Sequence, residues 1–118
     1  MTRLTEALSE RDWQRQVLDL ATLRRWTWYH THDSRRSPAG FPDLVLVRDR
    51  VIYAELKTDK GRLTTNQLAW QRILAAAGAE VYVWRPRDWD AVKVALTTRR
   101  NHAVPALSGA AEGRSGVR

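Results

Sequence analysis

The feature that most constrains this chain is the segment PDLVLVRDRVIYAELK, which begins at Pro42. Two runs of β-branched and aliphatic residues, typical of strands, flank a polar tripeptide at residues 48–50. A three-residue turn at this tripeptide predicts a hairpin in which Asp43 lies directly opposite Glu55. The Cβ atoms of the two acids would then be about 5 Å apart.

Directly opposed like charges destabilise a sheet, so this pair of acids is best explained by a cation between them. Lys57 follows Glu55 by two residues and should project from the same face of its strand. Two carboxylates, a backbone carbonyl and waters suit Mg²⁺, a metal that commonly serves phosphate chemistry. A structural alternative stays open, in which Asp43 caps a turn after Pro42 while Glu55 and Lys57 form a solvated pair.

The rest of the sequence predicts helices and strands in the order αβββαβ, followed by a C-terminal helix. Caps are expected at Ser9, at Thr64 with Gln67 closing a capping box, and at Asp88. The elements predicted outside the hairpin are helix 10–24, strand 26–32, helix 65–77, strand 80–85 and helix 88–96. Three strands in a meander and a helix crossing to a fourth give an α/β protein with a mixed (α+β) sheet covered by helices.

The composition favours a nucleic-acid partner. The chain of 118 residues has 20 Lys plus Arg against 13 Asp plus Glu, a formal net charge of +7, so DNA is expected before an anionic membrane surface. It has no cysteine, which excludes disulfides and thiolate zinc sites and leaves oxygen or imidazole ligands for a metal. The charged first residues and the short apolar runs predict a protein of the cytoplasm, bacterial or of a virus-infected host cell, that is neither secreted nor membrane-bound.

The length is that of one domain, which is expected to span residues 1–97. Residues 98–118 have too little apolar periodicity to pack and are expected to form a mobile tail. Trp70 and Trp84 lie within regular elements among aliphatic residues, and both are predicted to belong to the core rather than to stack on bases.

The hairpin motif also resembles that of a known family. Pro42-Asp43 and, twelve residues on, Glu55-Leu56-Lys57 are similar to the PD-(D/E)XK nuclease signature. The stretch GFPDLVLVRDRVIYAELKTDKGRLTTNQLAWQRILAAAGAEVYVWRP resembles the VRR-NUC family of virus-type replication-repair nucleases, and with the first helix the similarity covers roughly residues 6–97. The resemblance implies a restriction-endonuclease-like core and a Mg²⁺-dependent phosphodiesterase, with Mn²⁺ as a substitute, acting on DNA in repair and recombination.

The resemblance also implies roles for the residues of the motif. By position, Asp43 and Glu55 match the metal ligands, Leu56 would contribute its main-chain carbonyl, and Lys57 matches the catalytic lysine. Small members of the family that stand alone tend to act on branched DNA such as Holliday junctions. No small organic cofactor is implied.

Two further residues match the family by position. Glu10 corresponds to the acidic residue of the first helix, as a catalytic residue and metal ligand, with Glu6 as the reserve candidate. Gln67 corresponds to a glutamine of the site at the start of the second helix. Its side chain has a competing structural use, since it could close the capping box with Thr64.

Several polar residues near the motif are candidates for contacts with DNA: His30, Ser34, Arg35, Arg36, Lys60 and Arg62. Each also has a structural explanation. A histidine on a strand, such as His30 or His32, is often merely packed, a surface arginine pair is often only solvated, and Lys60 with Gly61 could simply form a turn.

The leading hypothesis is a metal-dependent, structure-selective endonuclease that cuts branched DNA without a covalent enzyme intermediate. A small chain that cuts both strands of a junction would most simply act as a homodimer. The competing hypotheses are a catalytically silent DNA-binding module and, among enzymes, a restriction nuclease or a flap or single-strand nuclease. Metal-dependent nicking of a four-way junction separates the enzyme from the module.

Overall fold

The computed structural model describes residues 8–31 and 38–100. Some of the predictions above concern residues outside these two ranges, namely Glu6, His32, Ser34, Arg35, Arg36 and residues 101–118.

The described elements follow the predicted order. They are α1 (Glu10–Leu23), β1 (Thr27–His30), β2 (Leu44–Val47), β3 (Val51–Leu56), α2 (Thr65–Ala76), β4 (Glu80–Trp84), a short 3-10 turn η2 (Pro86–Asp88) and α3 (Trp89–Thr97). The strands form a sheet in the order β1-β2-β3-β4. The first three strands pair antiparallel and β4 pairs parallel to β3, which confirms the mixed sheet.

The hairpin has the register that its turn predicts. Val47 pairs with Val51, and the Arg48 N–H donates to the Arg50 carbonyl at 3.0 Å. The same register, continued one residue beyond the pair of Leu44 with Ala54, sets Asp43 opposite Glu55. The two acids therefore share one face of the sheet at the end remote from the turn.

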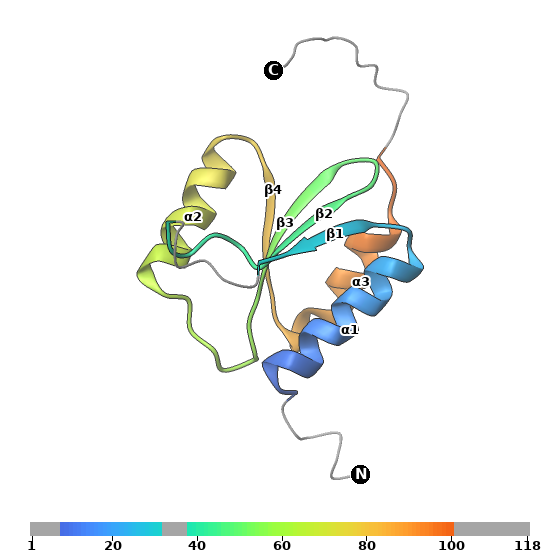
Figure 1. Cartoon of the computed structure of the whole chain (residues 1–118), viewed down its shortest axis with the longest axis horizontal. Helices are drawn as coiled ribbons and strands as arrows, with labels where there is room; N and C mark the ends of the chain where they lie inside the picture. Colours follow the sequence, from blue (N-terminus) through green and yellow to red (C-terminus); the bar gives the residue numbers. More distant parts are fainter. Residues whose placement is uncertain (1–7, 32–37, 101–118) are drawn as a thin grey trace.

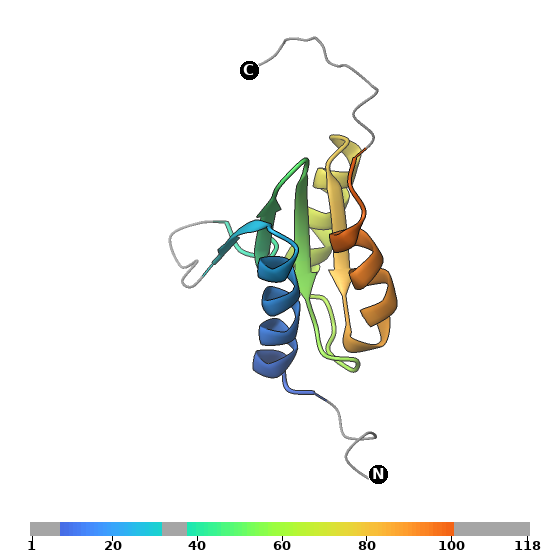
Figure 2. The ribbon, with the colours of Figure 1, turned by 90° about the vertical axis from the view of Figure 1, so that its right-hand side faces the viewer.

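The helices lie on the two faces of the sheet. Figure 1 shows α2 on one side of the strands and α1 with α3 on the other, and Figure 2 shows α1 and α3 side by side on their face. Because β3 is followed by a parallel strand, α2 has to cross over between them, and it lies on the face that carries Glu55. No helix in the described ranges is long and apolar enough to cross a membrane.

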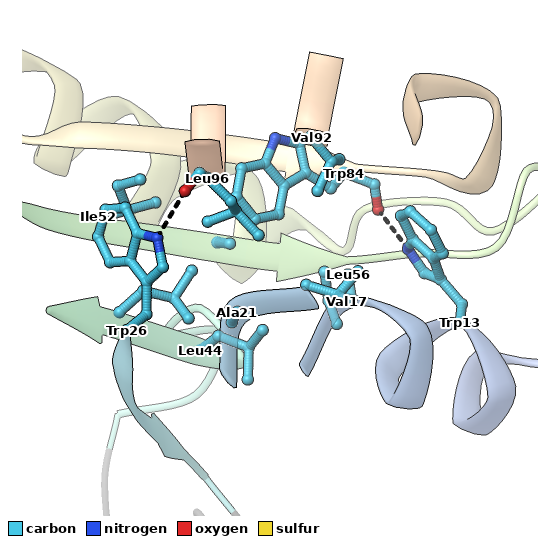
Figure 3. Packing of buried hydrophobic residues seen from close by; sticks show 12 residues of the cluster. Trp13, Val17, Ala21, Trp26, Leu44, Ile52, Leu56, Trp84, Val92 and Leu96 are labelled. Carbon is cyan, nitrogen blue, oxygen red and sulfur yellow. Dashed lines mark hydrogen bonds between the residues drawn. The ribbon is translucent and has the colours of Figure 1, made fainter. Parts of the chain in front are cut away.

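The main core lies between the sheet and the pair α1 and α3. Alternate strand residues, such as Leu44, Ile52 and Leu56, are buried there against Val17 of α1 and Val92 of α3 (Figure 3). Two indole N–H groups within this layer donate to backbone carbonyls at 2.9 Å, Trp13 to Trp84 and Trp26 to Leu96. The core position of Trp84 is confirmed at 3 % exposure, whereas Trp70 is half-buried on the other side of the sheet.

The predicted helix caps are correct at two starts and wrong in one detail. Ser9 Oγ accepts from the Asp12 N–H at 3.0 Å, and Thr64 with Gln67 forms the capping box. Asp88 stands at the N-cap position of α3 but makes no side-chain bond to that helix. Its carboxylate instead accepts from the Arg85 N–H at 2.9 Å, because the 3-10 turn η2, which begins at Pro86, lies directly before α3.

The turn at residues 48–50 does more than reverse the chain. Its two guanidinium groups donate to carbonyls at the C-terminal ends of two helices, Arg48 to Arg24, Leu96 and Thr98, and Arg50 to Ala95 and Thr98. They also lie over the Trp26 ring, at 4.4 and 5.3 Å from its centroid. Asp49 accepts from the Arg100 N–H, so Thr98 and Arg100, which the sequence assigns to the tail, are bonded to this turn.

Candidate active site

Asp43 and Glu55 meet at the carboxyl end of β3. Glu55 is in the strand, 2 % exposed, and Asp43 precedes β2 directly. The Leu56 N–H donates to Asp43 Oδ2 at 3.0 Å, which ties the Asp43 carboxylate to the end of β3. A solvated surface pair, the structural alternative for Glu55, is therefore excluded by its burial.

Glu55 is electrostatically unsatisfied. Gln67 Nε2 donates to Glu55 Oε2 at 2.9 Å, while Glu55 Oε1 is buried without a hydrogen-bond partner among the described residues. Burial raises the pKa of Glu55 to about 8, the negative charge of Asp43 adds to the effect, and the positive charge of Lys57 opposes it. A buried carboxylate oxygen without a partner costs free energy, and a cation between the two acids would remove that cost. This donor set fits a hard divalent ion.

Gln67 serves both of the uses that the sequence left open. Its Oε1 accepts from the Thr64 N–H at 2.9 Å, and Thr64 Oγ1 accepts from the Gln67 N–H at 3.0 Å. The amide nitrogen of the same side chain remains directed at Glu55. The capping box thus fixes the orientation of a side chain that in turn holds Glu55.

Lys57 follows β3 and is half-buried. The backbone N–H of Lys57 donates to the Trp84 carbonyl at 3.0 Å, and the same carbonyl accepts from the Trp13 indole at 2.9 Å. Its charge acts on Glu55, as the pKa of that residue shows. The structure therefore brings together four of the predicted site residues, Asp43, Glu55, Lys57 and Gln67, with Leu56 between Glu55 and Lys57 in the chain.

A family model for the VRR-NUC domain matches residues 4–88 of this chain. The chain belongs to the VRR-NUC domain family. Among solved structures, one described as a VRR_NUC domain protein is similar with a TM-score of 0.60 and 20% sequence identity, covering 77% of this chain and 92% of its own. That likeness supports the fold, and a search of curated proteins found no match. Membership implies a nuclease-type function and binding to DNA.

Not every predicted residue of this VRR-NUC domain lies with the others. Glu10 is exposed in the first turn of α1, and the described residues contain no group of three or more His, Cys, Asp or Glu that could hold a metal ion. His30 pairs with Leu44, so it shares the α1 face of the sheet, opposite to the face of Asp43. The roles of Glu10 in catalysis and of His30 in DNA binding stay predictions.

Lys60 and Arg62 project from the exposed loop between β3 and α2 of the VRR-NUC domain. This loop is braced from the segment after β4. Arg85 Nη1 donates to the carbonyls of Thr58 and Gly61, and the Arg87 N–H donates to Asp59 Oδ1 at 3.0 Å. These two arginines could not be identified from the sequence, because only the folded chain brings them close to the Thr58 and Gly61 carbonyls and to the Asp59 side chain.

Gly40 was also missed as a residue of the site. It has φ +98°, and a Cβ at this position would lie 2.5 Å from the Asn66 backbone carbon. Nearby, the Trp70 indole donates to the Ala39 carbonyl at 3.1 Å, so the segment before Asp43 lies directly on the start of α2. The signal was present in the sequence, since a glycine shortly before a motif residue often marks close backbone approach.

Proposed function

We propose that this VRR-NUC domain is a Mg²⁺-dependent endonuclease, with Mn²⁺ able to substitute, that hydrolyses phosphodiester bonds in branched DNA such as Holliday junctions. The observation that carries the proposal is Glu55 Oε1, which is buried beside the Asp43 carboxylate and has no hydrogen-bond partner in the described part of the chain. In the metal-free state this arrangement destabilises the fold, so a ligand of positive charge is expected at the site.

Three groups would hold the ion: the carboxylates of Asp43 and Glu55, and the main-chain carbonyl of Leu56. The Leu56 N–H is directed at Asp43, and in an extended strand the carbonyl of a residue points to the same side as its N–H. When bound, Mg²⁺ supplies charge neutralisation for phosphoryl oxygens and makes a bound water more acidic. Glu10 is proposed as an additional acid only if the start of α1 moves toward this cluster.

The other residues of the site orient Glu55 or stabilise negative charge. Gln67 orients Glu55 through a side chain that the capping box has already fixed. Lys57 provides a compact positive charge next to the carboxylates, suited to stabilising the extra negative charge of a phosphodiester transition state. Lys60 and Arg62 are proposed to contact DNA phosphates from the braced loop, and His30, Ser34, Arg35 and Arg36 are proposed as further contacts with DNA.

Branched DNA is the proposed substrate because the described residues form one small domain, which suits recognition of the shape of a junction better than reading of a long base sequence. A homodimer would set two such sites across the two strands of a junction. A catalytically silent DNA-binding module is less well supported, because a binder would gain nothing from a buried acid pair that faces phosphate.

The test uses the whole chain with a fluorescently labelled four-way junction and a linear duplex of the same sequence. Cleavage of the junction should require Mg²⁺ or Mn²⁺ and stop in EDTA. Asp43→Asn should lower the cleavage rate by at least about 100-fold, the scale seen when one group that stabilises a transition state is removed. Binding of Mn²⁺, followed by electron paramagnetic resonance, should weaken in the same variant.

The matched control is Asp90→Asn, which removes a carboxylate that is 97% exposed on α3. It should cut the junction as the unmodified protein does, and both variants should bind the junction in EDTA with unchanged affinity. Cleavage that persists in EDTA, or full turnover by the Asp43 variant, would contradict the proposal. Faster cleavage of flap or single-stranded substrates than of the junction would overturn the substrate assignment but not the nuclease activity.

A further inference from the structure

A groove lies between α1 and β1, on the other face of the sheet from Asp43 and Glu55. It has a volume of about 290 Å³ and is lined by Arg11, Gln14, Arg15, Leu18, Asp19 and Trp28. None of these residues takes part in the catalytic site described above. We refer to it as the α1–β1 groove.

Two cations of this groove are available to a ligand. Arg11 and Arg15 are both exposed and, within residues 8–31 and 38–100, neither guanidinium has a hydrogen bond or an ion pair. They are four residues apart on α1, so they lie on the same side of the helix, about 6 Å apart along its axis. This separation is close to that of consecutive phosphates in one nucleic-acid strand.

The aromatic wall of the groove is Trp28, on the edge strand β1. Its side chain is fixed, because the indole N–H donates to Thr22 Oγ1 at 3.1 Å, yet the residue is 41% exposed. An exposed tryptophan whose N–H is already satisfied offers ring surface and no further donor. Stacking on an unpaired base is the contact that such a surface makes best.

These observations lead us to propose that the α1–β1 groove binds a single strand of nucleic acid, with a base stacked on Trp28 and neighbouring phosphates at Arg11 and Arg15. Duplex DNA fits less well, because its bases are stacked on each other and cannot reach the indole. The proposal rests on the proposed function in one respect, that the bound strand belongs to the DNA that the enzyme cuts.

The position of the groove supports this link. Trp28 pairs with Leu46 on β2, and Leu46 is three residues from Asp43, which is about 10 Å of extended chain. A strand that leaves the catalytic face therefore has only the edge strand β1 to pass before it reaches the groove. The groove would hold an unpaired strand next to a branch point.

Asp19 allows a test in which the affinity for a single strand should rise rather than fall. It is exposed and is the acidic member of the lining, so it repels a phosphate that Arg15 attracts. Asp19→Asn should tighten binding of a single strand, whereas removal of the arginines or of the indole should weaken it.

The experiment measures fluorescence anisotropy of a labelled 15-nucleotide thymidine oligomer with the whole chain in EDTA, so that cleavage does not interfere. Trp28→Ala should weaken binding by at least about 5-fold, the lower end of what one base–aromatic stack contributes, and Trp28→Phe should keep most of the affinity. The pair Arg11→Ala and Arg15→Ala should reduce the slope of log affinity against log salt by about 1.4, at roughly 0.7 per phosphate contact.

Arg72→Ala is the matched control, because it removes an exposed arginine from α2, on the far face of the sheet. It should leave oligomer binding and its salt slope unchanged. Unchanged binding by Trp28→Ala and by the double arginine variant, or an equal loss in the Arg72 control, would overturn the proposal. Binding of Mn²⁺ and its weakening in Asp43→Asn report on the catalytic site separately, so failure of the groove and failure of the nuclease are distinguishable.

Discussion

At the scale of single residues, the folded state disfavours the ionised form of Glu55. Its pKa is about 8 in the fold, where burial and the charge of Asp43 disfavour ionisation, against 4.5 for an unperturbed glutamate. The metal-free protein therefore holds a proton on Glu55 that the unfolded chain releases. The stability that this proton provides is complete below about pH 4.5 and is lost as the pH rises toward 8.

Replacing Glu55 by Gln should stabilise the metal-free protein at high pH. The amide is neutral at every pH, so the variant and the unmodified protein should differ little near pH 4.5, and the difference should grow to on the order of a few kcal/mol by pH 8–9. Urea denaturation in EDTA across this range measures it. Acids that do not interact with Glu55 are common to both proteins and cancel in the comparison, whereas Asp43 interacts with Glu55 and does not. A difference that is flat with pH, or that favours the unmodified protein at pH 9, would contradict the assigned pKa.

The sequence predicted the identity of these residues better than their environment. The opposition of Asp43 and Glu55 follows from turn length and strand alternation, both of which can be read locally. The burial of Glu55 could not be read in this way, because it depends on α2 lying over the strand. The double role of Gln67 was seen as a choice between two uses, whereas its two functional groups allow both.

At the scale of elements, the hairpin turn holds two helices in place. Arg48 and Arg50 bond the last carbonyls of α1 and α3, groups that have no partner within their own helices. Burial would raise the pKa of Asp49, but hydrogen bonds from the Arg100 N–H and from Arg48 hold it well below its usual range. From the sequence, these residues were predicted only to form a polar turn. Their bonds to the helix ends could not be predicted, because those ends are distant in the chain.

Arg48→Ala should destabilise the protein by about 2–4 kcal/mol. The substitution removes a guanidinium that is 8% exposed and leaves several carbonyl groups without their donor. Denaturation by urea gives the change in free energy of unfolding. Lys93→Ala is the control, since Lys93 is 48% exposed and its ion pair with Asp90 is screened by solvent, so its loss should be a few tenths of a kcal/mol. Equal losses in both variants would show that the Arg48 bonds do not stabilise the fold.

At the scale of the whole molecule, the two faces of the sheet differ. Apart from the α1–β1 groove at the edge strand, the α1 and α3 face is closed by a continuous core, whereas α2 covers only part of the face that carries Asp43 and Glu55. On this open part, near the hairpin turn, Tyr29, Val47 and Val51 are 63%, 43% and 41% exposed. The order of elements predicted a mixed sheet covered by helices, but strand alternation alone could not indicate how much of each face a helix would cover.

The proposed homodimer should use this open apolar surface. Light scattering after size-exclusion chromatography should give twice the 13.6 kDa of the chain, and Val51→Lys should shift the protein to the monomer, because a buried charge without a partner opposes association. Val94→Lys is the control, since Val94 is 64% exposed on α3, and it should stay dimeric. An unmodified protein that elutes as a monomer at high concentration would end the dimer proposal.

The close approach of Gly40 to Asn66 has a consequence for how the site can change. One glycine fixes the spacing between the stretch that delivers Asp43 and the helix turn that delivers Gln67. Any side chain at this position would push these two segments apart, so both would move together and neither could be adjusted separately. In libraries built to alter substrate preference, position 40 should therefore be held constant while the loops around the site are varied.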